Sequence, residues 1–203
     1  GQRDGVDGQG RPLRLLIVGD SAAAGVGVDS QHMALTGRLV AELATDFQVQ
    51  WKMIARTGHT AQQVIDMLQQ HDHQTFDVVV TSVGVNDVTA NTKPAVWSDL
   101  QRQLIDLLQS RFGAKHILLS AVPPMHAFPA LPQPLRWFLG QQAKRLNNEL
   151  AILTHQHPHC QIVTADFPLE PAFMAADGFH PGAPAYAVWA GAVAQAIRLR
   201  LNN

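Results

Sequence analysis

The chain has 203 residues, a length that suits one domain. With 46% hydrophobic and 15% charged residues it can bury a sizeable core, which excludes an intrinsically disordered chain. The 15 Lys and Arg residues nearly balance the 16 Asp and Glu residues, and a net charge of −1 argues against a general nucleic-acid partner.

The cysteine count and the chain ends bear on where the protein works. Cys160 has no second cysteine to pair with, so an intrachain disulfide is excluded. No secretory signal is visible, but the chain begins at Gly1 without Met, which leaves open that an upstream segment was removed. The longest uncharged stretch, 179–197, contains Pro181 and Pro184 and predicts a buried last helix rather than a transmembrane segment. We expect a soluble monomer of the bacterial cytoplasm or periplasm.

Strand and helix signals alternate along the chain in a way that predicts its fold class. Residues 1–12 are rich in Gly, Asp, Gln and Arg and predict a flexible lead-in, so we assign the folded domain to 13–203. Short apolar runs predict buried strands over 13–18, 47–55, 78–83, 116–122 and 161–164. Apolar spacing and capping residues predict five helices. The first covers about 29–43, and the second begins at a capping box of Thr60 and Gln63. The third runs from Pro94 until Gly113 ends it, the fourth covers 135–153, and the last begins at about Ala183.

This alternation predicts a single-domain, three-layer α/β/α sandwich around a mostly parallel sheet of about five strands. Ligand sites in such folds lie beyond the carboxyl ends of the strands. Four groups of unusual residues follow the predicted strands or precede the last helix, so we expect them at that edge.

The first group is Gly19-Asp20-Ser21, after the first strand. A serine in this turn is exposed at the ligand edge, and its own N–H can face a developing oxyanion once a base activates the hydroxyl. Taken alone, the motif is more often an ordinary strand-to-helix turn, because short motifs frequently match by chance. Neither the phosphate-binding loop, nor the dinucleotide fingerprint, nor Gly-x-Ser-x-Gly fits the following residues, since Ala23 stands at the last position of that third motif.

The other groups supply the partners that a serine nucleophile needs. Gly58 allows close approach to a backbone N–H, and the Asn86 amide can donate to an oxyanion, although a turn glycine and a helix cap remain alternatives. Asp177 stands three residues before His180, so its carboxylate can orient that imidazole when the chain turns; a surface Asp and a helix-capping His are the alternative.

Taken in this order, Gly-Asp-Ser, Gly, Gly-x-Asn-Asp and Asp-x-x-His resemble the four sequence blocks of the SGNH (GDSL-like) hydrolases. The resemblance spans Gly19 to His180 and implies the flavodoxin-like fold of that family. It implies Ser21 as nucleophile, His180 as the base that activates it, and Asp177 as the carboxylate that orients His180. It also implies an oxyanion hole built from Ser21, Gly58 and Asn86. Ala22 stands where the name-giving motif has Leu, which weakens assignment to a subfamily.

The implied function is hydrolysis of carboxylic esters through an acyl-enzyme, with a small-molecule ester as partner and neither cofactor nor metal. Thioesterase, lysophospholipase and carbohydrate deacetylase activities are alternatives within the family, and a flavodoxin-like binding module for a small molecule or sugar is a non-enzymatic one. The loop 123–134 contains five prolines and leaves the fourth strand beside the same edge. We therefore expect short to medium acyl chains, with substrate contacts from Val85, Met125, Phe128 and Phe179.

Overall fold

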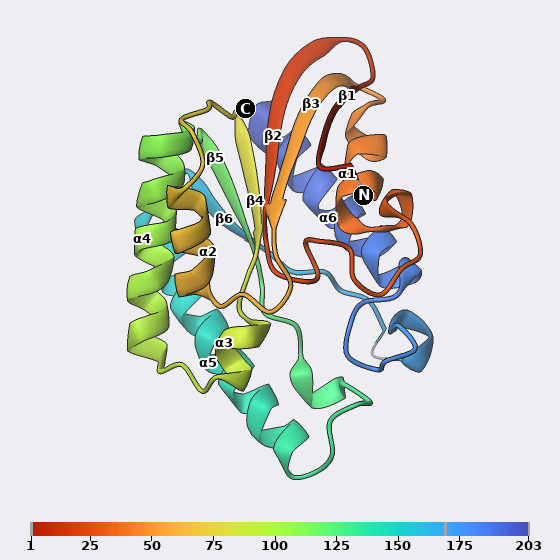
Figure 1. The fold of residues 1–203 in the computed structure, drawn as a ribbon, viewed down its shortest axis with the longest axis vertical. Helices are drawn as coiled ribbons and strands as arrows, with labels where there is room; N and C mark the ends of the chain where they lie inside the picture. The colour runs from red at the N-terminus through yellow and green to blue at the C-terminus, as the bar shows by residue number, and fades with distance from the viewer. Residues whose placement is uncertain (1, 169, 203) are drawn as a thin grey trace.

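The computed structural model describes residues 2–168 and 170–202, which form one six-stranded sheet with helices on both faces (Figure 1). The strand order is β1-β3-β2-β4-β5-β6; β2 to β6 run parallel, and β1 is antiparallel to β3. The predicted α/β/α sandwich is confirmed, with six strands instead of about five. They are β1 (Asp4–Asp7), β2 (Arg11–Gly19), β3 (Phe47–Ala55), β4 (Val78–Ser82), β5 (His116–Ser120) and β6 (Cys160–Val163).

The additional strand lies inside the segment that we expected to be a flexible lead-in, so that prediction was wrong for residues 4–7 and 11–12. Asp4 pairs with Lys52 and Asp7 with Val49, and Trp51 Nε1 donates to Asp7 Oδ2 over 2.8 Å. The segment escapes prediction because an exposed edge strand needs no apolar alternation to satisfy its backbone hydrogen bonds. Gly1 and Asn203, at the outer bounds of the two predicted segments, lie outside the described residues.

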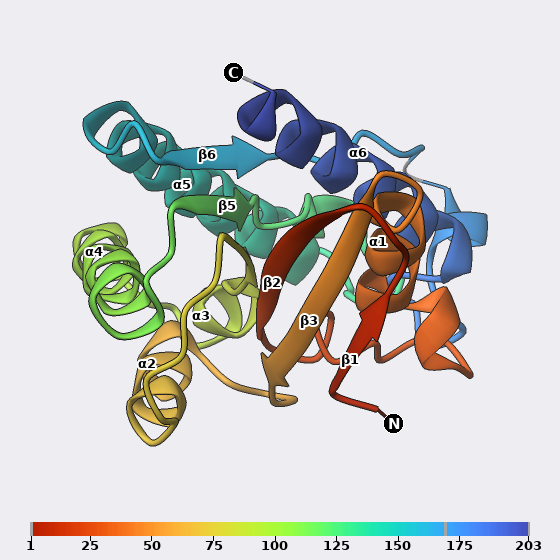
Figure 2. The same cartoon turned by 90° about the horizontal axis from the view of Figure 1, so that it is seen from above.

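Helices cover both faces of the sheet (Figure 2). Two apolar cores hold them there. α1 (Leu35–Leu43) and α6 (Ala183–Leu201) pack on one face, while α2 (Ala61–Gln69), α4 (Pro94–Phe112) and α5 (Leu135–Gln156) pack on the other. The predicted starts and ends of two helices are confirmed. Thr60 and Gln63 form a capping box at the start of α2, Pro94 is the first residue of α4, and Gly113 ends α4 in the left-handed conformation. Of the described helices, none has the length and apolar character needed to cross a membrane.

Three local features differ from the predicted helices and loops. The segment expected as one helix over 29–43 divides into a 3₁₀ turn, η1 (Gln31–Met33), and α1. The short helix α3 (Val85–Thr89) was not predicted, because only five residues separate Gly84 from Ala90 and they carry no helical repeat. Single turns also interrupt two loops, as η2 (Met125–Ala127) and η3 (Pro171–Phe173).

The strand register aligns the carboxyl ends that carry the candidate residues. Gly19, the last residue of β2, pairs with Ala55 at the end of β3 and with Ser82 at the end of β4. Because the chain crosses from β3 on one side of β2 to β4 on the other, this edge is the topological switch point of the sheet. The residues that follow β2, β3 and β4 therefore gather there.

Candidate active site

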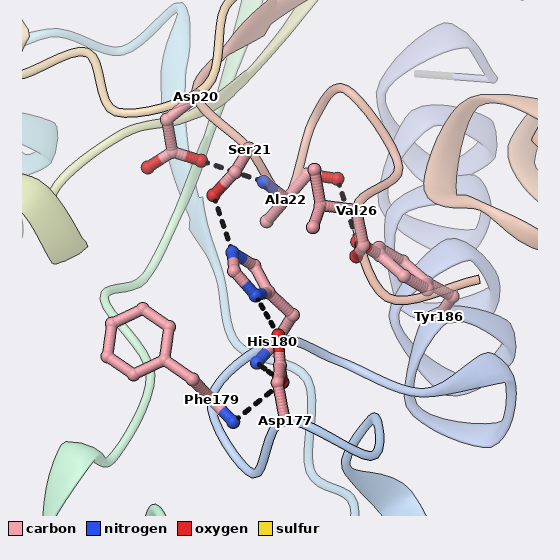
Figure 3. Close-up of polar contacts among 8 residues, drawn as sticks. All are labelled: Asp20, Ser21, Ala22, Val26, Asp177, Phe179, His180 and Tyr186. Atoms are coloured by element: carbon pink, nitrogen blue, oxygen red, sulfur yellow. Dashed lines mark hydrogen bonds and ion pairs between the residues drawn. The ribbon is translucent and has the colours of Figure 1, made fainter. Parts of the chain in front are cut away.

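Ser21, His180 and Asp177 form a continuous hydrogen-bonded chain at this edge (Figure 3). His180 Nε2 lies 3.0 Å from Ser21 Oγ, and His180 Nδ1 lies 2.6 Å from Asp177 Oδ2. When Nδ1 carries the proton and donates it to the carboxylate, the lone pair of Nε2 faces the serine hydroxyl. The arrangement can accept a proton from Ser21 without any movement of the ring.

The turn that carries Asp177 and His180 is held by its own hydrogen bonds. Asp177 Oδ1 accepts from the backbone N–H groups of Phe179 and His180 over 2.9 and 3.0 Å, and Gly178 adopts a positive φ of 66°. Partial burial would raise the pKa of the Asp177 carboxyl, but these bonds and the His180 imidazole outweigh burial and lower it to about 2. Asp177 is therefore ionised when His180 needs a negative partner.

Tight backbone packing fixes the turn that carries Ser21. A side chain at Gly19 would collide with the carbonyl oxygen of Ser82, so only glycine lets β2 lie this close to β4. The buried Tyr186 hydroxyl of α6 donates to the carbonyl oxygens of Ala22 and Val26, over 3.1 and 2.7 Å (Figure 3). These contacts hold the turn from both ends and leave Ser21 at its start.

The structure also brings Gly58 and Asn86 to the neighbourhood of Ser21. Gly58 has a φ of 81°, and apart from its two chain neighbours no described residue has an atom within 4 Å of the position that a side chain would take. Asn86, in α3, donates from Nδ2 to the carbonyl oxygen of His59 over 3.0 Å, and the same nitrogen lies 3.5 Å from Asp20 Oδ2. One side-chain amide therefore links the residue after Gly58 to the residue before Ser21.

Two buried carboxylates connect the same three segments, and sequence reasoning missed both. Asp20 is 3% exposed and accepts from the N–H of Ala22, while Asp87 is 1% exposed and accepts from the N–H of Ala61 at the start of α2. Asp20 thus reaches from the Ser21 turn toward Asn86, and Asp87 ties α3 to the helix that follows Gly58. The only sequence signal for a role of these two aspartates was that each is a direct neighbour of a predicted site residue, Ser21 or Asn86.

Desolvation dominates the electrostatics of this acidic pair. Burial raises the pKa of Asp20 to about 7, against the opposing bond from Ala22, and the nearby charge of Asp87 adds to the rise. Burial likewise raises the pKa of Asp87 to about 6, although the bond from Ala61 favours its charged form. The pKa values of both acids therefore lie near neutral pH, and Asp20 has its raised pKa beside Asn86 Nδ2 and the Ala22 N–H of the Ser21 turn.

A pocket of about 110 Å³ opens beside Ser21 and His180 and extends over the ends of β4, β5 and β6. Its floor includes Ser120, whose hydroxyl accepts from Trp189 Nε1 over 3.1 Å. Most of its walls are hydrocarbon, contributed by separate loops. Among the lining residues are Val85, Val122, Phe128, Phe167, Met174 and Phe179.

Of the four predicted substrate contacts, Val85, Phe128 and Phe179 line this pocket, but Met125 does not. Met125 is fully buried in the core beneath α5, so the expectation that it faces substrate was wrong. The proline-rich loop turns at η2, so its apolar side chains point in different directions. The composition of the loop does not show which of them faces the pocket. Phe167, Met174 and Trp189 were missed because they arrive from loops and a helix face with no motif of their own.

The histidines outside the triad do not assemble into an evident metal centre. In the part of the chain that the structure describes, no three His, Cys, Asp or Glu side chains gather closely enough to hold a metal ion. His157 and His159 stack edge to face near the amino end of β6, with ring centroids 5.6 Å apart. They lie at the opposite sheet edge from Ser21.

Comparison with known proteins places these residues in a family. A family model described as the GDSL-like lipase/acylhydrolase family matches residues 17–188. The GDSL-like esterase Rv1075c of Mycobacterium tuberculosis is 27% identical over 202 residues, which cover 94% of this chain. The chain spans only 63% of the length of that relative.

Two solved structures share the fold. The psychrotrophic esterase EstA from Pseudoalteromonas sp., inhibited by monoethylphosphonate, is 18% identical with a TM-score of 0.70, covering 94% of this chain and 100% of that one. Est24, a carbohydrate acetylesterase from Sinorhizobium meliloti, is 18% identical with a TM-score of 0.67, covering 92% and 99%.

The family match spans most of the chain, from within β2 to within α6. It includes the Ser21 turn, Gly58, Asn86 and the Asp177–His180 turn. The chain therefore belongs to the GDSL-like lipase/acylhydrolase family.

Proposed function

We propose that the protein is a serine ester hydrolase that cleaves carboxylic esters of short to medium acyl chains through an acyl-enzyme on Ser21. The observation that carries this proposal is the chain from Asp177 through His180 to Ser21, with contacts of 2.6 and 3.0 Å, at the mouth of an apolar pocket. A simple binding module has no need for a hydroxyl aligned with a base in this way.

In this mechanism Ser21 Oγ attacks the ester carbonyl carbon while His180 Nε2 takes the hydroxyl proton. Asp177 accepts the Nδ1–H bond and stabilises the imidazolium. The backbone N–H groups of Ser21 and Gly58 donate to the oxyanion, and so does the Nδ2 hydrogen of Asn86 that is not bonded to the His59 carbonyl. His180 then returns the proton to the leaving alkoxide, and water repeats the attack on the acyl-enzyme with His180 as base again.

The pocket supports an apolar acyl group over a polar one. Val85, Phe128 and Phe179 line it, and each methylene that leaves water for such walls gains up to about 0.8 kcal/mol. Its volume of about 110 Å³ limits how many methylenes can enter. Thioesters and lysophospholipids carry the same acyl chemistry and remain alternative substrates, as do the acetyl groups of carbohydrates.

The nucleophile is tested by covalent labelling. A fluorophosphonate should give one adduct, on the peptide that contains Ser21, and Ser21→Ala should abolish both the adduct and ester hydrolysis. Ser30 is exposed and its side chain caps no helix, so Ser30→Ala is the matched control and should label like the parent. A flavodoxin-like binding module would leave the whole chain unlabelled, and an adduct on another serine would reject Ser21.

Asn86→Ala should act on the transition state. Loss of one oxyanion donor typically costs on the order of 10²–10³ in kcat, with little change in KM. Asn148 is exposed on α5, so Asn148→Ala serves as the control and should leave both constants unchanged. A raised KM at constant kcat would show instead that Asn86 binds the ground-state substrate.

Asp20→Asn should make the protein more stable but slower. The folded pKa of Asp20 is raised to about 7, so the parent loses stability as pH rises from about 4 to 7, and the neutral variant does not. The new amide would face Asn86 Nδ2 donor to donor, and the resulting displacement should lower kcat about 10–100-fold.

Urea unfolding and kcat at pH 5 and pH 8 check both effects. The stability gain of the Asp20→Asn variant over the parent should be larger at pH 8. The exposed Asp29→Asn is the control and should match the parent in both measurements. A stability difference that does not vary with pH, or an unchanged kcat, would contradict this role of Asp20.

Phe128→Leu should shift the preferred acyl length. Phe128 is 5% exposed and lines the pocket, and a smaller side chain leaves room for further methylenes, each gaining up to about four-fold in kcat/KM. Nitrophenyl esters of rising acyl length measure the profile. Met125→Leu changes a core residue off the pocket and should keep the parent profile; identical profiles in all three proteins would mean that Phe128 does not contact the acyl chain.

A further inference from the structure

The first turn of α5 exposes three large apolar side chains within four successive residues. Leu135 is 45% exposed, Trp137 59% and Phe138 43%. These two rings are the only aromatic side chains among the exposed large apolar residues that the structure describes. Apart from Leu135, the others are nonaromatic residues that stand singly in the sequence, which is normal on a protein surface, whereas neighbouring exposed aromatics indicate an interaction site.

This turn and the loop before it, residues 129–138, form a tip beside the mouth of the pocket. In Figure 1 the amino end of α5 projects beyond the carboxyl edge of the sheet, the edge at which β2 ends two residues before Ser21. The backbone N–H of Ala130 donates to the carbonyl oxygen of Gly178 over 3.1 Å, which joins the tip to the Asp177–His180 turn. Phe128, just before the tip, lies with its ring centroid 5.3 Å from that of Phe179 in the pocket wall.

The sequence around the tip carries charge of one sign, and Asp177, an acid in the turn that adjoins the tip, is paired with His180. From residue 107 to residue 148 the sequence contains neither Asp nor Glu, although the whole chain carries 16 of them. Arg136 lies within the tip, and Lys144 and Arg145 are exposed two turns further along α5. Exposed aromatic rings flanked by cations are complementary to a surface with an apolar interior and anionic headgroups.

We propose that this tip docks the protein on anionic phospholipid surfaces, with Trp137 and Phe138 at the level of the headgroups and the three cations against the lipid phosphates. A protein partner is the less favoured occupant, because a stable protein interface buries about 800 Å² on each side and the tip offers only three large apolar side chains. Proline-rich residues 129–134 lower the entropy lost when the tip inserts. Docking turns the pocket mouth toward esters held in or near the membrane. This consequence rests on the proposed function, whereas the docking itself does not depend on it.

Trp137 provides a direct signal for docking. The other three tryptophans, Trp51, Trp97 and Trp189, are at most 9% exposed, so a change in emission on adding vesicles reports Trp137. With vesicles of phosphatidylglycerol and phosphatidylcholine in equal parts, the emission should shift to shorter wavelength and the protein should co-sediment. With pure phosphatidylcholine, both effects should be much weaker.

Variants separate the apolar and the charged contributions. Trp137→Ser with Phe138→Ser should weaken co-sedimentation at least ten-fold. Lys144→Gln and Arg145→Gln should each weaken it about five-fold on the anionic vesicles. The matched control, Val188→Ser with Leu199→Ser, removes exposed apolar side chains from α6 and should bind like the parent.

Turnover of a soluble nitrophenyl ester should be unchanged in the tip variants. That readout keeps docking distinct from catalysis, because Ser21→Ala should lose turnover and still bind vesicles. Absence of vesicle binding by the parent, or equal loss in the α6 control, would overturn the proposal. Concentration-dependent dimers in light scattering that disappear with the tip variant would identify the tip as a protein interface instead.

Discussion

Gly19 pairs with Ala55 on one side and Ser82 on the other, and the close contact that this register creates governs the site. A side chain at Gly19 would meet the carbonyl oxygen of Ser82, so a larger residue would force β2 and β4 apart. Separation of those strands would carry the Ser21 turn away from α3, where Asn86 lies. The geometry of the site therefore begins with backbone packing, before any catalytic side chain takes part.

The aspartates of this fold show how environment decides what one residue type does. Asp77, at the amino edge, lies 3.0 Å from Arg14 and 3.1 Å from Lys115; these partners overcome its partial burial and lower its pKa to about 2. Asp177 reaches a similar value through His180 and two backbone donors. Asp20 makes no ion pair with any described cation, and burial raises its pKa to about 7. A buried carboxyl without a cation costs stability when ionised, which indicates that its position serves the Ser21 turn and not the fold.

Local signals predicted the regular elements, and four motifs located the site residues that the structure brings together. Apolar runs of β2 to β6 and the caps at Thr60, Pro94 and Gly113 are properties of neighbouring residues, which a single sequence displays. β1 and the orientation of Met125 depend on pairing and packing with distant segments. The same limit applies to Asp20 and Asp87, since nothing in their sequence neighbours reveals that both carboxyls would be buried.

The loop after β5 links the chemistry of the site to its surroundings. Met125 anchors it in the core, Phe128 forms part of the pocket wall, and Ala130 holds Gly178 in the turn that carries the base. A side chain at Gly178 would lie about 3.0 Å from the Ala130 nitrogen, and the positive φ of this residue also favours glycine at the contact between the two loops. The positions of His180, of the acyl-pocket wall and of the exposed tip are thus coupled through one short segment. Truncation of its core-facing residues should disturb all three, unlike the volume-conserving Met125→Leu. Changes at Trp137 and Phe138, beyond the last of these contacts, should leave the positions of His180 and of the pocket wall unchanged.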